Sequence, residues 1–309
     1  MRKTLKINEP QNDIKEVLDS FILNCKVRGL SNETIEAYNS QCTMFIQFIG
    51  SKNIQDVTSS DIDKYVLYCR TKGNNNTSIR TKIKILKAFF NFSEVEIKFP
   101  VLTTEKVAKN PYNKEEIQAL LKKPTINSYT QWRNWTMVNT LLATGMRCRT
   151  LINLKVKDID FTNNTIYLST TKTKKSYYIP LSHDLKLALK YYLSLFSYNE
   201  NDYLFLTLYA EQMSRSAVKQ TIRDYNLSKG ITKTSIHLFR HTFAINAIKM
   251  GMPLPYLQEV LGHSSIETTR QYLHITVEDL KQDFNMYSTL DNMNRKGIKL
   301  TNDKKKAGK

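Results

Sequence analysis

Five residues between positions 147 and 272 have side chains that could hold and attack a phosphate group. Arg147 follows a glycine break in ATGMR, His237 and Arg240 stand three apart in HLFRH, and His263 precedes Tyr272 by nine residues. Arginine presents a planar fork of donors to phosphate oxygens, whereas histidine presents a single donor whose charge depends on pH. His237 and Arg240 share one face near an expected helix start, where free backbone N–H groups also favour an anion.

Tyr272 could be a nucleophile or could simply lie on a short helix. A free phenol has a pKa of about 10, so it needs a site that withdraws charge from the phosphate and a partner for its proton. In LGHSSIETTRQYLH, Ser264 and Glu267 have the spacing of a capping box, which predicts a helix start after the glycine. We interpret the neighbouring His241 and His274 as structural or supporting residues. Other phenols lack a histidine at the same distance before them: Tyr177, Tyr178 and Tyr287.

Three lysines lie in a short loop between two runs rich in β-forming residues. TIYLST (165–170) and SYYIPL (176–181) are joined by TKTKK, a pattern that predicts a β-hairpin. Lys172 lies at its tip, and we expect Lys174 and Lys175 beside it to contact DNA. Taken alone, a lysine in a hairpin loop is usually a solvent-exposed charge.

The elements around these residues predict two domains. Apolar positions at helical spacing fill residues 13–98, so we expect a domain made only of helices there, after a flexible N-terminus at 1–12. Residues 99–110 contain Pro100 and lack strong periodicity, which indicates a linker. Residues 111–285 mix helices with the small hairpin and predict an α+β domain. Residues 286–309 form a basic tail.

The charge balance favours a nucleic-acid partner. The 309 residues include 46 Lys and Arg against 28 Asp and Glu, a formal net charge of +18. Arg80, Lys84 and Lys87 recur on one face of an expected helix, where they could contact phosphates or simply face solvent. The scattered cysteines predict reduced, structural thiols rather than disulfides or a zinc site. No acidic cluster suggests a metal site either. No run approaches the roughly 18 apolar residues of a membrane span, and the polar N-terminus is no signal peptide.

In order and spacing, the chemically interesting residues resemble the catalytic signature of the tyrosine recombinase (phage integrase) family. The matching positions are Arg147, Lys172, His237, Arg240, His263 and Tyr272. ATGMR resembles the first arginine box, TKTKKSYYIPL the family's hairpin, and HLFRHTFA with LGHSSIETTRQYLH the second box. GLSNETIEAY and TSIRTKIKILKAFFNF resemble the core-binding domain, so the similarity extends from about residue 12 to 285. Many members carry Ser-Glu where this chain has Arg149 and Thr150, a departure that concerns local packing more than activity.

The resemblance implies a fold and a reaction. The fold would be mainly α, with a SAM-like helical core-binding domain and a mixed catalytic domain that contains a small antiparallel sheet. Tyr272 would attack the scissile phosphate to form a 3′-phosphotyrosine, Lys172 would protonate the leaving 5′-oxygen, and His237 would accept the tyrosine proton. Two arginines would stabilise the transition state, and no metal or other cofactor would be needed. Strand exchange would pass through a Holliday junction within a tetramer on double-stranded DNA.

Other functions remain open from the sequence. A type IB topoisomerase uses the same chemistry without joining two sites, and a DNA-binding regulator could have lost catalysis. With no extra arm-binding domain expected, a Xer-like or transposon-type recombinase fits best, serving a mobile element or replicon resolution. We expect such a protein in the cytoplasm, associated with the bacterial nucleoid. In the resembling family the segment after the tyrosine often packs on a neighbouring subunit, and Phe284, Tyr287 and Leu290 recur at a spacing that suits such docking.

Overall fold

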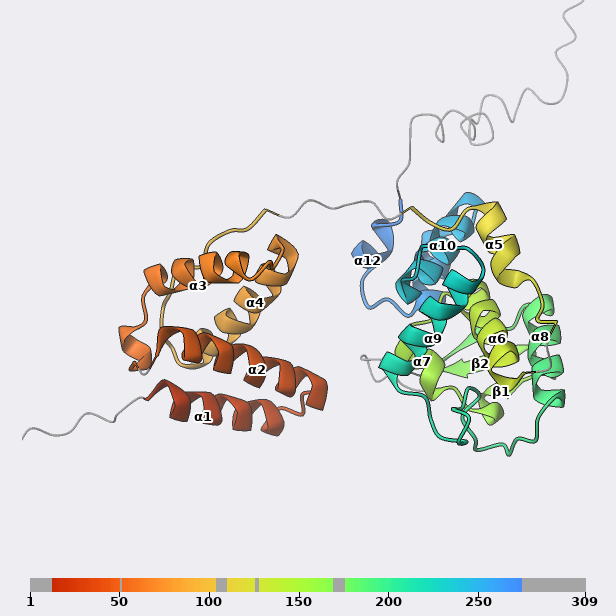
Figure 1. Cartoon of the computed structure of the whole chain (residues 1–309), viewed down its shortest axis with the longest axis horizontal. Helices are drawn as coiled ribbons and strands as arrows, with labels where there is room; N and C mark the ends of the chain where they lie inside the picture. The colour runs from red at the N-terminus through yellow and green to blue at the C-terminus, as the bar shows by residue number, and fades with distance from the viewer. Residues whose placement is uncertain (1–12, 51, 104–109, 126–127, 169–175, 274–309) are drawn as a thin grey trace, which may run out of the picture. The chain divides into compact units, whose positions relative to one another are not determined.

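The computed structural model describes residues 13–50, 52–103, 110–125, 128–168 and 176–273. The chain divides into two compact units, residues 1–108 and 109–309 (Figure 1). Among the described residues, no helix combines the length and apolar character required to cross a bilayer.

The described part of the N-terminal unit is helical, as the periodicity predicts. Its elements are α1 (Ile14–Val27), α2 (Asn32–Ile49), a 3-10 turn η1 (Ile54–Asp56), α3 (Ser59–Thr71) and α4 (Asn76–Phe92). Side chains fix the helix starts: Asn75 caps α4, and Thr58 forms a capping box with Asp61 at the start of α3. Phe45 and Phe90 pack edge to face in the core beneath these helices.

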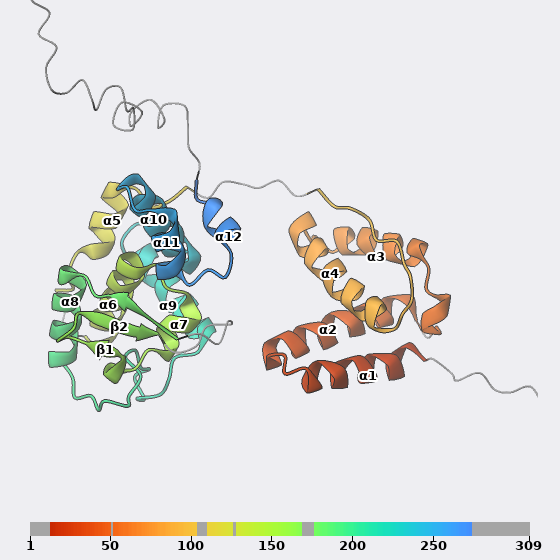
Figure 2. The same cartoon turned by 180° about the vertical axis from the view of Figure 1, so that it is seen from behind.

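The second unit surrounds a buried central helix. Its helices are α5 (Lys114–Leu121), α6 (Tyr129–Thr144), α7 (Cys148–Asn153), the 3-10 turn η2 (Val156–Asp158), α8 (His183–Ser194), α9 (Arg215–Ser228), α10 (Ile236–Lys249), α11 (Leu254–Leu261) and α12 (Ile266–Arg270). Helix α6 is buried around most of its circumference because α5, α8, α9 and α10 all pack against it. Figure 2 shows α10, α11 and α12 grouped together in this unit.

A small antiparallel sheet completes the second unit. Its order is β1 (Ile159–Asp160), β2 (Thr165–Leu168), β3 (Tyr177–Pro180). The register pairs Ile166 with Ile179 and Leu168 with Tyr177, so these four side chains share one face of the sheet. The mainly α fold and the hairpin are therefore confirmed, while the two-residue strand β1 is too short to show alternation in the sequence. Lys172, Lys174 and Lys175 lie outside the described residues.

One local prediction around the second arginine box needs correction. The cap of α12 is Ser265, whose hydroxyl accepts from the Glu267 amide, so the box expected at Ser264 was wrong by one residue. Helix α10 has no single core stripe, because its buried positions run round most of the helix. Helix α10 packs against α6 on one side and α11 on another, and two packing partners require two buried faces.

Candidate active site

The first arginine lies at a sharp turn between two helices. Helix α6 ends at Gly145, which has a φ of 60°, and Arg147 is the N-terminal cap residue of α7. A β-carbon at Gly145 would come within 2.6 Å of the Phe243 ring, so both the backbone conformation and the close packing require glycine. The turn directs the half-buried Arg147 toward the end of α11. Its Nη1 donates to the carbonyl oxygens of Leu261 at 3.3 Å and Gly262 at 3.0 Å.

The second arginine reaches the same place from α10. Arg240 is only 6% exposed. Its Nη1 donates to the Gly145 carbonyl at 2.9 Å, and its Nη2 donates to the Leu261 carbonyl at 2.8 Å. Both guanidiniums therefore share one acceptor, although 93 residues separate them in the sequence. The carbonyl of Leu261 fixes the spacing between them.

The positive charge of this pair is not cancelled within the described structure. Burial, together with the charge of Arg147, lowers the pKa of Arg240 to about 10, so its guanidinium remains protonated at neutral pH. Among the described residues, no carboxylate forms an ion pair with either guanidinium. Two adjacent, partly desolvated cations held by neutral carbonyls form a site that favours an anion.

His263 lies next to the arginine pair and is neutral. It is 8% exposed, and its Nδ1 is 2.8 Å from the hydroxyl oxygen of the buried Thr269. Burial lowers the pKa of His263 to about 4, and the charges of Arg240 and Arg147 act in the same direction. The bond to Thr269 fixes the orientation of the ring. His263 can therefore serve as a hydrogen-bonding group without adding charge.

Tyr272 follows α12 and packs beside the rings of His263 and His241. Its ring is nearly parallel to that of His263, with centroids 6.2 Å apart, and lies 5.4 Å from the ring of His241. The Tyr272 phenol also hydrogen-bonds with the Arg240 guanidinium, and this interaction opposes the lowering of the guanidinium pKa. A phenol that reaches a guanidinium in this way is close to any phosphate bound there.

The other residues expected at the site are distributed as follows. His237 is exposed on the first turn of α10, one turn before Arg240, and Arg149 is exposed on α7. Lys172 and His274 lie outside the described residues. Arg80, Lys84 and Lys87 are exposed on α4, a helix with no acidic residue in its sequence.

Three features of the site had no clear signal in the sequence. The carbonyls of Gly145 and Leu261 anchor the arginines, but carbonyls are present at every residue. Thr269 orients His263 across a turn whose geometry the spacing does not reveal. Tyr177 lacks the histidine spacing of a nucleophile, yet the structure places it against Gly262. Strand alternation does put Tyr177 on the face of Ile179, and that signal could have drawn attention to it.

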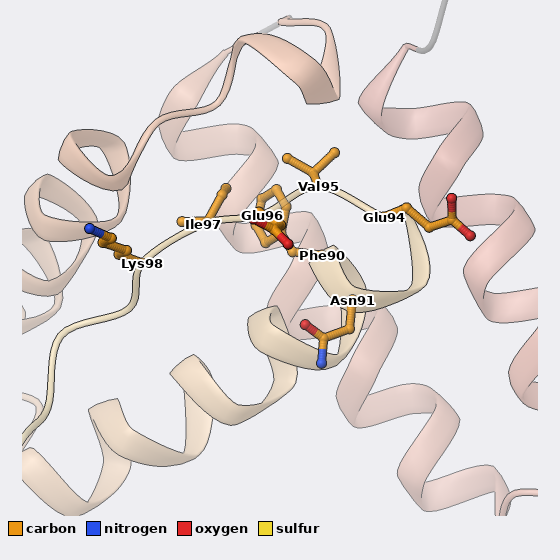
Figure 3. Close-up of a pocket in the computed structure, with 7 residues that line it drawn as sticks. All are labelled: Phe90, Asn91, Glu94, Val95, Glu96, Ile97 and Lys98. Atoms are coloured by element: carbon orange, nitrogen blue, oxygen red, sulfur yellow. The ribbon is translucent and has the colours of Figure 1, made fainter.

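A pocket in the N-terminal unit is a poor candidate for the same chemistry. Its volume is about 520 Å³, and it is lined by Phe90, Asn91, Glu94, Val95, Glu96, Ile97 and Lys98 (Figure 3). Two of the lining residues are carboxylates, which would repel a phosphate.

Comparison with known proteins agrees with the chemistry of the site. The phage integrase family model matches residues 112–279, and a model of the phage integrase N-terminal SAM-like domain matches residues 17–94. The tyrosine recombinase XerA of Pyrococcus furiosus is 28% identical over 284 residues, which cover 90% of this chain and 96% of that protein.

Solved structures share the fold. The integrase of transposon Tn1549, in complex with transposon right end DNA, superposes with a TM-score of 0.73 at 22% identity, over 88% of this chain and 99% of the other. A lambda integrase tetramer bound to a Holliday junction gives a TM-score of 0.69 at 17% identity, over 85% and 78% of the two chains. With one family model over most of the second unit and another over most of the first, this chain belongs to the phage integrase family of tyrosine recombinases.

Proposed function

We propose that this chain is a site-specific DNA recombinase that cuts and rejoins DNA through a phosphotyrosine. The observation that carries the proposal is the convergence of Arg147 and Arg240 on the Leu261 carbonyl, with the Tyr272 phenol acting on the same Arg240. The pair provides positive charge for the phosphate, and the phenol provides the attacking oxygen.

The reaction exchanges one phosphate ester for another. The Tyr272 oxygen attacks phosphorus, a bond forms between them, and the bond from phosphorus to the 5′-oxygen breaks. Arg147 and Arg240 stabilise the charge that develops on the non-bridging oxygens, and neutral His263 adds a hydrogen bond. The 3′-phosphotyrosine conserves the ester, so a 5′-hydroxyl from another strand can reverse the step. Because the guanidiniums supply the charge, we expect cleavage to proceed in EDTA.

Two protons must move in this step. Lys172, on the loop between β2 and β3, is the proposed donor to the leaving 5′-oxygen. His237 is the proposed acceptor of the Tyr272 proton. His241 is the competing acceptor, because its ring packs against Tyr272. Asparagine variants of the two histidines, compared for cleavage rate against pH, distinguish them.

The DNA and the assembly follow from charge and family. The net charge of +18 suits a protein that binds duplex DNA. The proposed contacts with its phosphates are the basic residues of α4 together with Lys174 and Lys175. We propose a tetramer on two paired sites, an assembly of the kind that lambda integrase forms on a Holliday junction. Both replicon resolution and the movement of a mobile element are proposed uses of this reaction, and the likeness to the integrase of transposon Tn1549 favours the second. For either process we propose that the protein acts on nucleoid DNA in the cytoplasm.

A nicked suicide substrate tests the chemistry. Such a substrate releases its short 5′-hydroxyl strand after cleavage, so the covalent protein–DNA adduct accumulates. The wild-type chain should form this adduct, whereas Tyr272→Phe should bind the same DNA and form none. An adduct with the phenylalanine variant would remove Tyr272 from its role. Relaxation of supercoiled DNA without exchange between two sites would instead indicate a topoisomerase, and sequence-specific binding without any adduct would indicate a regulator.

A further inference from the structure

Tyr177 lies close to Arg147 and Arg240, although the reaction proposed above assigns it no role. It is the first residue of β3, and its register opposite Leu168 turns its side chain to the inner face of the sheet with Ile179. Its ring packs on Gly262, at the end of α11. A β-carbon at Gly262 would lie 3.0 Å from Tyr177 Cζ and would overlap the hydroxyl. The phenol therefore reaches the residue whose carbonyl binds Arg147.

The hydroxyl of Tyr177 is available as a donor. Burial raises the pKa of the phenol, and the nearby charges of Arg240 and Arg147 only partly oppose this effect, so the proton stays in place. Among the residues that the structure describes, none forms a hydrogen bond with this hydroxyl. Partly buried phenols usually find a partner. The charges that act on this phenol are those of Arg240 and Arg147 and, more weakly, that of Glu259. Because the two cations outnumber the carboxylate, the missing partner should be an anion.

We propose that Tyr177 is a further active-site residue, whose hydroxyl donates a hydrogen bond to a non-bridging oxygen of the phosphate held by Arg147 and Arg240. The proposal rests on the proposed phosphoryl transfer at Tyr272. It assigns two phenols to one phosphate, with Tyr272 forming the bond and Tyr177 stabilising the charge. It also explains why Gly262 must lack a side chain, since a methyl group there would displace the donor.

The neighbouring residue provides a matched control. Tyr178 is on the opposite face of the same strand, is 66% exposed, and packs its ring against Tyr167. We expect Tyr177→Phe to bind DNA with unchanged affinity but to form the covalent adduct about 10- to 100-fold more slowly in a single turnover. Tyr178→Phe should match the wild-type rate. Equal rates for Tyr177→Phe and wild type would overturn the proposal.

Chemically altered DNA separates hydrogen bonding from packing. In methylphosphonate substrates, one non-bridging oxygen of the scissile phosphate is replaced by a methyl group, in either of two stereoisomers. If Tyr177 donates to one of these oxygens, the penalty of Tyr177→Phe should disappear with one isomer and persist with the other. An equal penalty with both isomers would show a structural role and reject the proposal. Failure of the wild-type chain to form any adduct would instead reject the proposed function itself.

Discussion

Arg147 and Arg149 are two residues apart, but their surroundings differ. Arg147 is half-buried and bonds to two carbonyls at the end of α11, whereas Arg149 is exposed on α7. We expect Arg147→Gln to slow adduct formation by about 100- to 1,000-fold, because the variant removes a charged donor to the transition state. Arg149→Gln should alter the rate by about twofold at most, as is usual at exposed positions. A quench-flow comparison measures both, and a large decrease only in Arg149→Gln would move the anion site to α7.

His263 should make the stability of the second unit depend on pH. Its pKa is about 4 in the folded chain and 6.5 in a free side chain, so folding favours the neutral ring. The unfolded chain then binds more protons between these values, and stability must fall as the pH drops below about 6.5. We expect the decrease in Tm between about pH 7 and about pH 5 to be smaller in His263→Gln than in wild type. Calorimetry of both proteins tests this, and identical pH profiles would show that the ring is not held neutral by folding.

At this scale, sequence reasoning identified side chains that the structure brings together, and their catalytic roles stay predictions. Arg147, Arg240, His263 and Tyr272 could be named from type and spacing, and the structure brings them together. The partners that hold them could not be named in this way. Thr269 and the carbonyl of Leu261 are recognised only once α10, α11 and α12 are packed, because their role depends on distance rather than on residue type.

Among the elements, α4 is the proposed contact with the DNA backbone. Its exposed Arg80, Lys84 and Lys87 recur along one face, while Lys82 is turned to Gln41 and bonds to it at 2.9 Å. Replacing the three exposed residues with glutamine should flatten the plot of log affinity against log salt. The slope should change by about 0.9 for each phosphate that the variant no longer neutralises, because fewer counterions are released on binding.

A control with the same reduction of charge is available on α1 and its cap. Lys15, Lys26 and Arg28 are also exposed. Glutamine at these three positions should leave the slope closer to that of wild type. Equal slopes for the two triple variants, measured by fluorescence anisotropy, would show that α4 acts only through net charge.

The elements also show where periodicity is a good guide and where it is not. Helices α1 to α4 each have one buried face, so their apolar spacing predicted them well. Helix α10 is buried on two faces and has no single stripe that periodicity could reveal. The turn before α12 depended on which of two adjacent serines has the extended backbone of a cap, and spacing alone cannot choose between them.

For the whole molecule, the open question is how active sites are coupled. Residues 286–309 carry a net charge of +5, and Phe284, Tyr287 and Leu290 precede most of that charge. These residues lie outside the described ones, and docking of this apolar stripe on a second copy stays a prediction. Truncation after Asp283 should preserve binding and cleavage at a single site but impair the pairing and exchange of two sites.

A shorter truncation is the matched control. Removal of the residues after Leu300 deletes four lysines and leaves the apolar stripe in place. This variant should recombine two sites at close to the wild-type rate. If truncation after Asp283 also recombined normally, the tail would serve only as a source of nonspecific DNA affinity.

The anchoring of both arginines by main-chain carbonyls has a consequence for inheritance. Every amino acid has a main-chain carbonyl oxygen. A substitution at Leu261 can therefore shift the oxygen that accepts from both guanidiniums, but it cannot remove that oxygen. The vulnerable positions are instead Gly145 and Gly262, where the β-carbon of any other residue would collide with Phe243 or with Tyr177, respectively. Drift in this lineage should therefore be narrow at the two glycines, whereas residue 261 can change to any other apolar residue that fits the core without loss of the acceptor.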